Sequence, residues 1–274
     1  MTAGPMMQPG PGSNQYRSRR ATSGLPPAAS LRDQAGAGWD GVRFGMARDR
    51  RTLPDDLDRL AHDPWSGVRL GVAGNSGALP GTLGRLARDP DREVRLLVAE
   101  NLSTPPRALA QLAHDSEEVV RRGVAWHRQT PPSALRELAR DPSLDVRLGV
   151  ARNPSSPSAV FEQMASDPDP GMRAMVATNS ASPPAVLERL ARDPVEETRA
   201  AVAGNPSSSP TVLEQSVRDP EFWVRLEAAR NPSCPPAVLR LLLQDSVGSV
   251  RAAAADNPEL PADLRALWQL AHNA

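Results

Sequence analysis

The chain has 274 residues and no formal net charge, because 32 acidic residues balance 32 basic residues, all of them arginine. Zero net charge argues against a general nucleic-acid coat or a binder of anionic membranes, since both depend on a bulk positive field. The single cysteine, Cys234, excludes an internal disulfide and a cysteine-based metal site, and it fits a reducing, cytoplasmic setting. No apolar run is long enough to cross a membrane, and no secretory signal is present at the N-terminus. Arginine without lysine, beside abundant alanine, glycine and proline, indicates GC-rich coding and a bacterial source.

Residues 1–36 differ in composition from the rest of the chain. They are rich in glycine, proline, serine and glutamine and carry no periodic apolar pattern. We expect them to form a disordered tail. The remaining 37–274 are expected to form one folded unit.

That unit repeats itself every 26 residues. Arginine recurs at this spacing from Arg43 to Arg251, and alanine follows four residues later in every case, from Ala47 to Ala255. The residue before the arginine is valine except at Met172 and Thr198. An aspartate stands six residues before each arginine from Arg69 onward, and an asparagine stands two residues after each alanine from Ala73 onward, with His127 as the exception. So many matches within one chain establish an internal repeat.

Each repeat is predicted to contain two short helices. In 130–153, Thr130 is predicted to cap the first helix with Pro131 at its first position, and Asp141 to cap the second in the same way. Leucines and valines at helical spacing give each helix one apolar face. Asn153 suits a left-handed residue after the second helix. No window alternates as a strand does, so the fold class is all-α.

Helices this short are marginal alone, so the repeats must stack to bury a core. We therefore expect a right-handed superhelical solenoid of about 8.5 repeats. The first element of each repeat is expected to be an α-helix, and the second either an α- or a 3₁₀-helix. Residues 37–53 are expected to act as a degenerate N-terminal cap, and 258–274 as a C-terminal capping helix.

The unit resembles the leucine-rich repeat variant family, on segments such as 138–154 (LARDPSLDVRLGVARNP) and 190–206 (LARDPVEETRAAVAGNP). The resemblance covers about 40–274 and implies a right-handed superhelix of alternating α- and 3₁₀-helices that serves in binding or scaffolding. The aspartate and arginine spacing also resembles HEAT repeats, in which these residues form a ladder between layers. Some family members carry an N-terminal iron–sulfur module, but residues 1–40 contain no cysteine, so no cluster is expected here.

The arginine and aspartate columns have two interpretations. The arginines can form a track for phosphate or carboxylate groups, or they can pair with the aspartates as a structural ladder, which we favour because the two columns match almost one to one. The ladder residues would be Asp63, Asp89, Asp115, Asp141, Asp167, Asp193, Asp219 and Asp245 with Arg69, Arg95, Arg121, Arg147, Arg173, Arg199, Arg225 and Arg251.

Candidate partner-binding residues are those that depart from the repeat at variable positions of the second helices. Aromatic residues at such positions are typical hot spots, although local packing would also explain them. Acidic residues in the first turns can attract a basic partner, or simply complement the helix dipole. The candidates are Trp126, His127, Phe222, Trp223, Glu118 and Glu196.

These patterns favour a non-catalytic scaffold that binds a protein or peptide on the variable face of the solenoid. The alternative is nucleic-acid binding through a concave face that contains arginine, and a less favoured one is an enzyme accessory or HEAT-like lyase. No catalytic residue, cofactor site or metal site is expected. Cys234 occupies the column that holds Thr104, Thr130, Ser156, Ser182 and Ser208 in earlier repeats, and it is interpreted as a replacement of serine rather than as a nucleophile.

Overall fold

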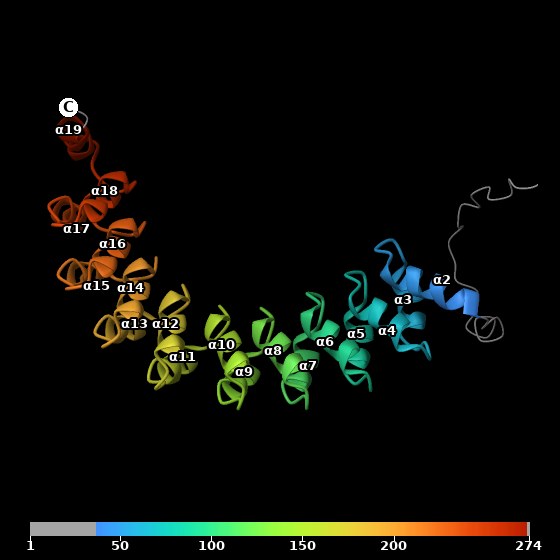
Figure 1. Ribbon diagram of the computed structural model, residues 1–274. Coiled ribbons are helices and arrows are strands. Elements are labelled where there is room, and N and C mark those ends of the chain that lie inside the picture. The colour runs from blue at the N-terminus through green and yellow to red at the C-terminus, as the bar shows by residue number, and fades with distance from the viewer. Residues whose placement is uncertain (1–36, 273–274) are drawn as a thin grey trace, which may run out of the picture.

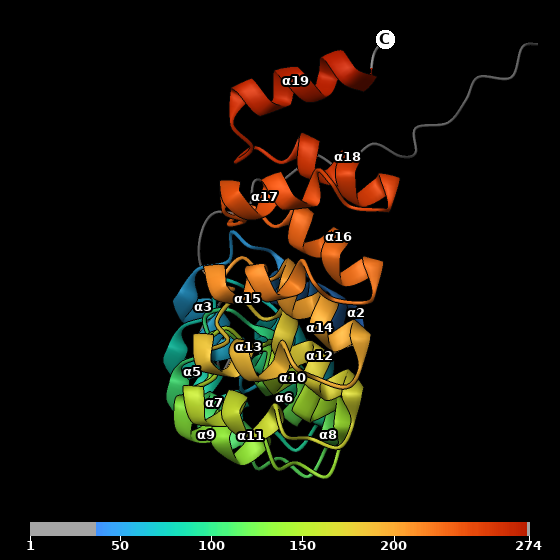
Figure 2. The ribbon, with the colours of Figure 1, turned by 90° about the vertical axis from the view of Figure 1, so that its left-hand side faces the viewer.

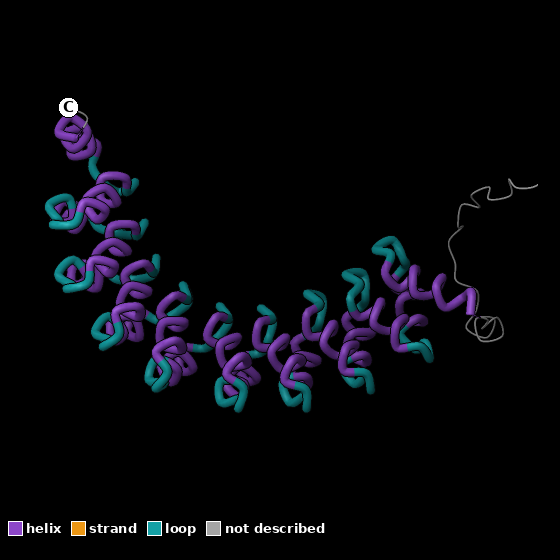
Figure 3. Tube along the Cα trace, in the orientation of Figure 1, coloured by secondary structure: helices purple, strands orange, loops and turns teal. Residues whose placement is uncertain are grey.

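The computed structural model describes residues 37–272, and all the regular structure in that range is helical. The helices form two rows that run side by side along a crescent, with loops at its edges (Figures 1, 2 and 3). The even-numbered helices are called the inner row, because α6 to α18 lie toward the concave side. They are α2 (Ala37–Arg48), α4 (Ser66–Ala73), α6 (Arg92–Glu100), α8 (Glu118–Trp126), α10 (Leu144–Arg152), α12 (Pro170–Thr178), α14 (Glu196–Gly204), α16 (Phe222–Arg230) and α18 (Gly248–Asp256).

The odd-numbered helices form the outer row. They are α3 (Pro54–Leu60), α5 (Pro80–Leu86), α7 (Pro106–Leu112), α9 (Pro132–Leu138), α11 (Ser158–Met164), α13 (Pro184–Leu190), α15 (Pro210–Ser216), α17 (Pro236–Leu242) and α19 (Ala262–His272). Both elements of each repeat are therefore α-helical, and the 3₁₀-helix that the family resemblance implied is not found in the described residues. Neighbouring inner helices pack closely and neighbouring outer helices touch little, which is what a curved stack requires. The core lies between the rows, where side chains such as Leu187 and Val202 are fully buried.

The predicted start of the outer helices is wrong by one residue. Helix α9 begins at Pro132, and Pro131 is its cap residue in an extended conformation. A proline disfavours helical geometry in the residue before it, so the second proline of the pair sets the first helical position. The hydroxyl of Thr130 does not cap this helix, because it donates to the carbonyl of Val124 at 2.6 Å and so caps the end of α8.

The inner helices also begin later than predicted. Asp141 accepts a hydrogen bond from the backbone N–H of Ser143 at 2.9 Å, which closes a turn before the helix. Helix α10 begins at Leu144, with Ser143 rather than Asp141 as its cap residue. The recurring aspartate therefore shapes the turn, and its second oxygen accepts a hydrogen bond from the arginine of the preceding repeat, as Asp141 does from Arg121.

The recurring asparagine joins one repeat to the repeat before it. Asn205 is extended, with φ −72° and ψ 124°, and Asn153 has the same geometry, so the left-handed conformation predicted for Asn153 is wrong. The Nδ2 group of Asn205 donates to the carbonyls of Ala177 at 2.6 Å and Asn179 at 2.9 Å. Its Oδ1 accepts from the N–H of Ser207 at 2.8 Å. Equivalent bonds recur from Asn75 to Asn257, so a column of asparagines ties the layers together.

Close contact between inner helices depends on small residues. A Cβ atom added to Gly149 would lie 2.9 Å from the Cβ of Ala125 and 3.0 Å from the ring of Trp126. We expect Gly149→Val to lower the free energy of unfolding by about 2 kcal/mol, because α8 and α10 must separate to admit it. Gly81 has nothing within 4 Å of its added Cβ, so Gly81→Ala is the control and should leave urea unfolding nearly unchanged. Equal effects at both positions would contradict this packing.

The apolar core divides into two clusters near α14 and α15. Here Thr198 and Ser216 occupy columns that hold valine or methionine and leucine or methionine in the other repeats. The hydroxyl of Ser216 donates to the carbonyl of Val212 at 2.9 Å, whereas the buried hydroxyl of Thr198 has no hydrogen-bond partner. A buried hydroxyl without a partner destabilises the fold.

Replacing Thr198 by valine is therefore expected to raise the free energy of unfolding by about 1 kcal/mol, since valine has the same shape and no hydroxyl. Thr82 is equally buried, but its hydroxyl donates to Asp58. Thr82→Val should consequently destabilise the protein. Urea unfolding of both variants checks the pair, and a loss of stability in Thr198→Val would contradict the assignment.

The two ends of the stack differ from its repeats. At the N-terminal end Trp65 packs on Phe44, with ring centroids 5.5 Å apart, and α2 takes the place of an inner helix. At the other end α19 is a lone outer helix, and Leu267 and Leu270 on it are exposed. We retain 37–53 and 258–274 as proposed caps. The tail predicted for residues 1–36 lies outside the described residues.

Candidate partner-binding surface and the arginine ladder

Arginines of the inner helices pair with aspartates of the following repeat. In each pair the guanidinium Nε lies 2.6 to 2.7 Å from the Oδ2 of an aspartate 20 residues later. From Arg69 onward the Nη1 group donates to the carbonyl of the aspartate in its own repeat, for example Arg199 to Asp193 at 2.9 Å. The pairs are Arg43–Asp63, Arg69–Asp89, Arg95–Asp115, Arg121–Asp141, Arg173–Asp193, Arg199–Asp219 and Arg225–Asp245.

Charge pairing outweighs burial in this ladder. Burial acts to raise the pKa of Asp115, Asp141, Asp193 and Asp245, but bonds from the paired arginine and a backbone N–H hold each pKa below its ordinary value. The hydrogen bond to Asp219 raises the pKa of Arg199. The guanidinium groups of these pairs are largely enclosed, so they are not free to hold phosphates. The nucleic-acid alternative would use these arginines on the concave face, but the ladder already engages most of them.

The ladder is interrupted between α10 and α12. Arg147 donates to the carbonyls of Asp141 and Pro142, but no ion pair joins it to Asp167. The asparagine bond across the same interface, from Asn179 to the carbonyl of Asn153, is 3.4 Å long, against 2.8 to 3.0 Å elsewhere. Arg251, at the last rung, has alanine rather than aspartate 20 residues later.

Trp126 stands at the end of α8 with 47% of its surface exposed. Its ring lies against the backbone of Gly149 in the next repeat, and the guanidinium of Arg152 lies 5.3 Å from the ring centroid. The Nε of Arg152 in turn lies 2.7 Å from the sulfur of Met175. These contacts hold an exposed tryptophan in one position before any partner arrives. Sequence reasoning missed Arg152, although it occupies the same column as Trp126 one repeat later.

His127 does not belong to this surface. It is only 5% exposed, and its Nε2 lies 3.0 Å from the carbonyl of Asn101 while its Nδ1 accepts from the N–H of Gln129 at 3.1 Å. It thus takes the place of the recurring asparagine, as a neutral imidazole with its proton on Nε2. Both ring nitrogens of His127 are therefore used within the fold, and the surface proposed below does not include this residue.

Burial lowers the pKa of His127 from its ordinary value of 6.5. The unfolded chain takes up a proton near that pH and the folded protein does not, so stability is complete above it and falls as the pH drops toward the folded pKa. We expect wild type to lose stability relative to His127→Asn between about pH 7 and about pH 5. Urea unfolding across that range checks this, and parallel curves for the two proteins would contradict it.

The other candidate residues lie on separate inner helices. Phe222 and Trp223 begin α16, with ring centroids 4.2 Å apart; Phe222 is half-buried and Trp223 is 54% exposed. Glu118 and Glu196 are exposed in the first turns of α8 and α14. The structure therefore spreads these side chains along the inner row rather than bringing them into one cluster. An extended partner could meet them all, whereas a small ligand could not.

The thiol of Cys234 is buried within the fold. Cys234 is 1% exposed, and burial raises the pKa of its thiol to about 12, so the reactive thiolate is suppressed. Over 37–272, no three histidine, cysteine, aspartate or glutamate side chains are grouped to hold a metal ion. No helix in that range combines the length and apolar character needed to cross a lipid bilayer.

The repeat unit is similar to that of known proteins. The model of the leucine rich repeat variant family matches residues 92–117, 144–169, 170–195 and 222–247. A solved structure described as a leucine-rich repeat variant with a novel repetitive structural motif is 27% identical, over 77% of this chain and 84% of that chain, with a TM-score of 0.54. The X-ray structure of YibA from Escherichia coli is 18% identical over 80% of this chain and 96% of that chain, with a TM-score of 0.41. No curated protein matches the chain.

Proposed function

We propose that this chain, a solenoid of leucine-rich variant repeats, is a non-catalytic scaffold that binds another protein or a peptide along its inner row. The observation that carries the proposal is Trp126, which is exposed yet held by Gly149 and Arg152. A large apolar ring fixed before binding loses little entropy in a complex, which is why tryptophan and arginine dominate binding hot spots. With Cys234 as its one thiol, we place this activity in the cytoplasm.

The bonds that join neighbouring repeats support this use of the inner row. The arginine and asparagine columns fix the backbone of each layer, so the residues between them can vary without loss of the fold. Trp126 on α8 and Trp223 on α16 are separated by three inner helices, and both remain exposed. A partner segment that follows the inner row can rest apolar side chains on both rings. The exposed Glu118 and Glu196 would then meet basic groups of the same partner.

The experiment is affinity capture from a native lysate, with and without nuclease, using wild type, Trp126→Ala and Trp223→Ala. Arg107→Ala is the matched control, because Arg107 is exposed on α7 in the outer row. We expect a stoichiometric protein that survives nuclease and is retained by the control but lost from both tryptophan variants. Capture that disappears with nuclease would favour the nucleic-acid alternative. Retention by both tryptophan variants would refute the inner-row assignment.

A further inference from the structure

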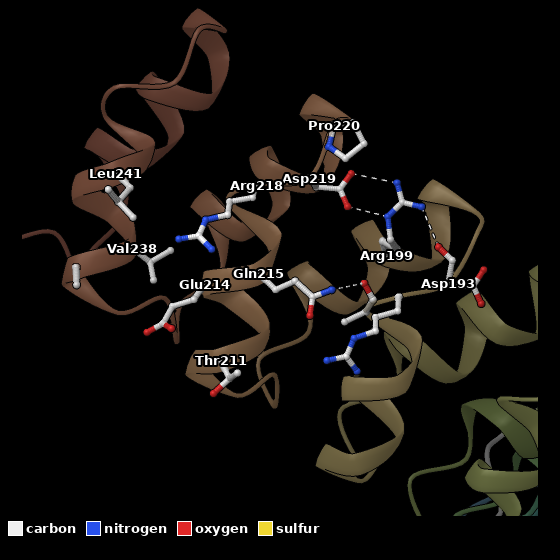
Figure 4. Close-up of a pocket in the computed structure, with 13 residues that line it drawn as sticks. Asp193, Arg199, Thr211, Glu214, Gln215, Arg218, Asp219, Pro220, Val238 and Leu241 are labelled. Carbon is white, nitrogen blue, oxygen red and sulfur yellow. Dashed lines mark hydrogen bonds and ion pairs between the residues drawn. The ribbon is translucent and has the colours of Figure 1, made fainter.

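A groove of about 800 Å³ lies on the outer row, around α15 and between α13 and α17 (Figure 4). Its walls come from the turn after α13, from Arg199 on α14, from α15 and the turn after it, and from α17. Neither Trp126 nor Trp223 lines it. The groove is therefore separate from the inner-row surface.

The groove opens toward α17 because a bridge between outer helices is missing. In several repeats a polar side chain on the outer helix reaches back to the previous repeat: Gln111 donates to the carbonyl of Ala87 at 3.2 Å, and Gln215 to that of Ala191 at 3.1 Å. Arg85, Glu137 and Arg189 make comparable contacts in the same column. The residue in this column on α17 is Leu241, which cannot form such a bond.

Leu241 instead gives the groove an apolar wall. Its side chain is 55% exposed at a column that is polar in the preceding repeats, and Val238 and Ala237 lie beside it in the lining. Single exposed apolar residues are common on protein surfaces, so exposure alone does not mark Leu241. What distinguishes Leu241 is its place in the wall of a groove, at a column that is polar in the preceding repeats.

The opposite wall carries charges that the fold does not use. Arg218 and Glu214 project from the α15 side toward Val238 and Leu241 (Figure 4), and no ion pair joins either of them to another described residue. The other lining pair, Arg199 and Asp219, is neutralised within the ladder, with bonds of 2.7 and 3.0 Å. Arg192 also lines the groove and bonds only to the carbonyl of Glu188, whereas Asp193 is paired with Arg173. The guanidinium groups of Arg192 and Arg218 and the carboxylate of Glu214 therefore line the groove without an ion pair to a described residue.

We propose that this groove binds a segment of a partner protein that presents aliphatic side chains between an acidic and a basic side chain. The aliphatic groups lie against Leu241 and Ala237, which are exposed, whereas Val238 behind them is buried. Arg218 donates to the carboxylate of the segment, and Glu214 accepts from its basic group. The site stands apart from the inner-row function proposed above, and each can fail without the other.

The probe is the synthetic peptide acetyl-Asp-Leu-Leu-Lys-amide, with acetyl-Asp-Ser-Ser-Lys-amide as its control. Binding is followed by NMR on the full chain, through the methyl signals of Leu241 and the indole signals of Trp126 and Trp223. We expect saturable shifts at Leu241 with the leucine peptide only. The variant Leu241→Gln restores the bridging residue of α15, so it should fold, bond to the carbonyl of Val217 and bind about tenfold more weakly. Arg218→Glu should weaken binding similarly, and Trp126→Ala should not.

Three results would overturn the proposal. The first is the absence of shifts at Leu241 at millimolar peptide, and the second is equal binding by Leu241→Gln with an unchanged melting temperature. The third is a response of the tryptophan indoles in place of Leu241, which would put the peptide on the inner row. Capture experiments with Trp126→Ala and Trp223→Ala test the inner row alone, so failure of one site is distinguishable from failure of the other.

Discussion

Replacing Asn205 by alanine is expected to lower the free energy of unfolding by about 3 kcal/mol. The side chain of Asn205 is 2% exposed and bonds to Ala177, Asn179 and Ser207. Alanine would leave two buried carbonyls and one partly buried N–H without their present partner. Each such buried group costs about 1 kcal/mol or more.

Asn205→Asp is the matched variant, because it keeps the shape and the acceptor but loses the donor. Its carboxylate would face the carbonyls of Ala177 and Asn179, so burial and repulsion would raise its pKa in the folded state. The folded variant then binds more protons than the unfolded chain, and lowering the pH favours folding. We expect the deficit of Asn205→Asp relative to wild type to shrink as the pH falls from about 7 to about 4.

Urea unfolding of both variants at those two pH values checks the asparagine column. A loss below about 1 kcal/mol for Asn205→Ala would mean that the column does not hold the layers together. A deficit of Asn205→Asp that does not change with pH would mean that its carboxyl group is exposed to water.

Replacing Arg199 by methionine is expected to cost about 2 kcal/mol. Methionine keeps the apolar stem but leaves Asp219, whose side chain is 9% exposed, without the guanidinium that neutralises it. The double variant Arg199→Met, Asp219→Asn should lose less than the sum of the two single variants, since asparagine still accepts from Glu221 and carries no charge. Arg147→Met is the control, because Arg147 bonds only to carbonyls, and it should cost less than Arg199→Met.

Urea unfolding of these variants at neutral pH tests the ladder. Equal losses for Arg147→Met and Arg199→Met would show that the carbonyl bonds, and not the ion pair, stabilise each layer. Exact additivity in the double variant would show that Arg199 and Asp219 do not interact.

The 26-residue period and the apolar helix faces that form the core were predictable, because both recur many times within this one chain. Spacing alone placed Arg199 and Asp219 in matched columns, and the all-α class followed from the apolar faces. The local roles of Thr130, Asp141 and Asn153 were predicted wrongly. Each was assigned to its own helix, whereas the structure uses Thr130 for the preceding helix and Asn153 for the preceding repeat. Hydrogen bonds between layers depend on how far apart neighbouring repeats lie, and the sequence of a single repeat does not give that distance.

The candidate surface was predictable only in part. Departures from the repeat identified Trp126 and Trp223, which are exposed, but the same reasoning selected His127, which is buried. A change of residue type in a buried column looks the same in sequence as a change in an exposed one. The groove at Leu241 was missed because it forms where α17 makes no side-chain bond back to the previous repeat, and that missing contact is visible only in the structure.

The interrupted rung between α10 and α12 gives the crescent unequal stiffness. Every other interface along the stack from α2 to α18 is clamped by an ion pair, whereas this one lacks the pair and has the longest asparagine bond. Deformation under load concentrates where restoring forces are weakest, so bending of the arc is greatest at this joint. Trp126 lies on one side of it and Trp223 on the other, on α8 and α16. The distance between the two rings therefore changes most when the arc bends at this joint.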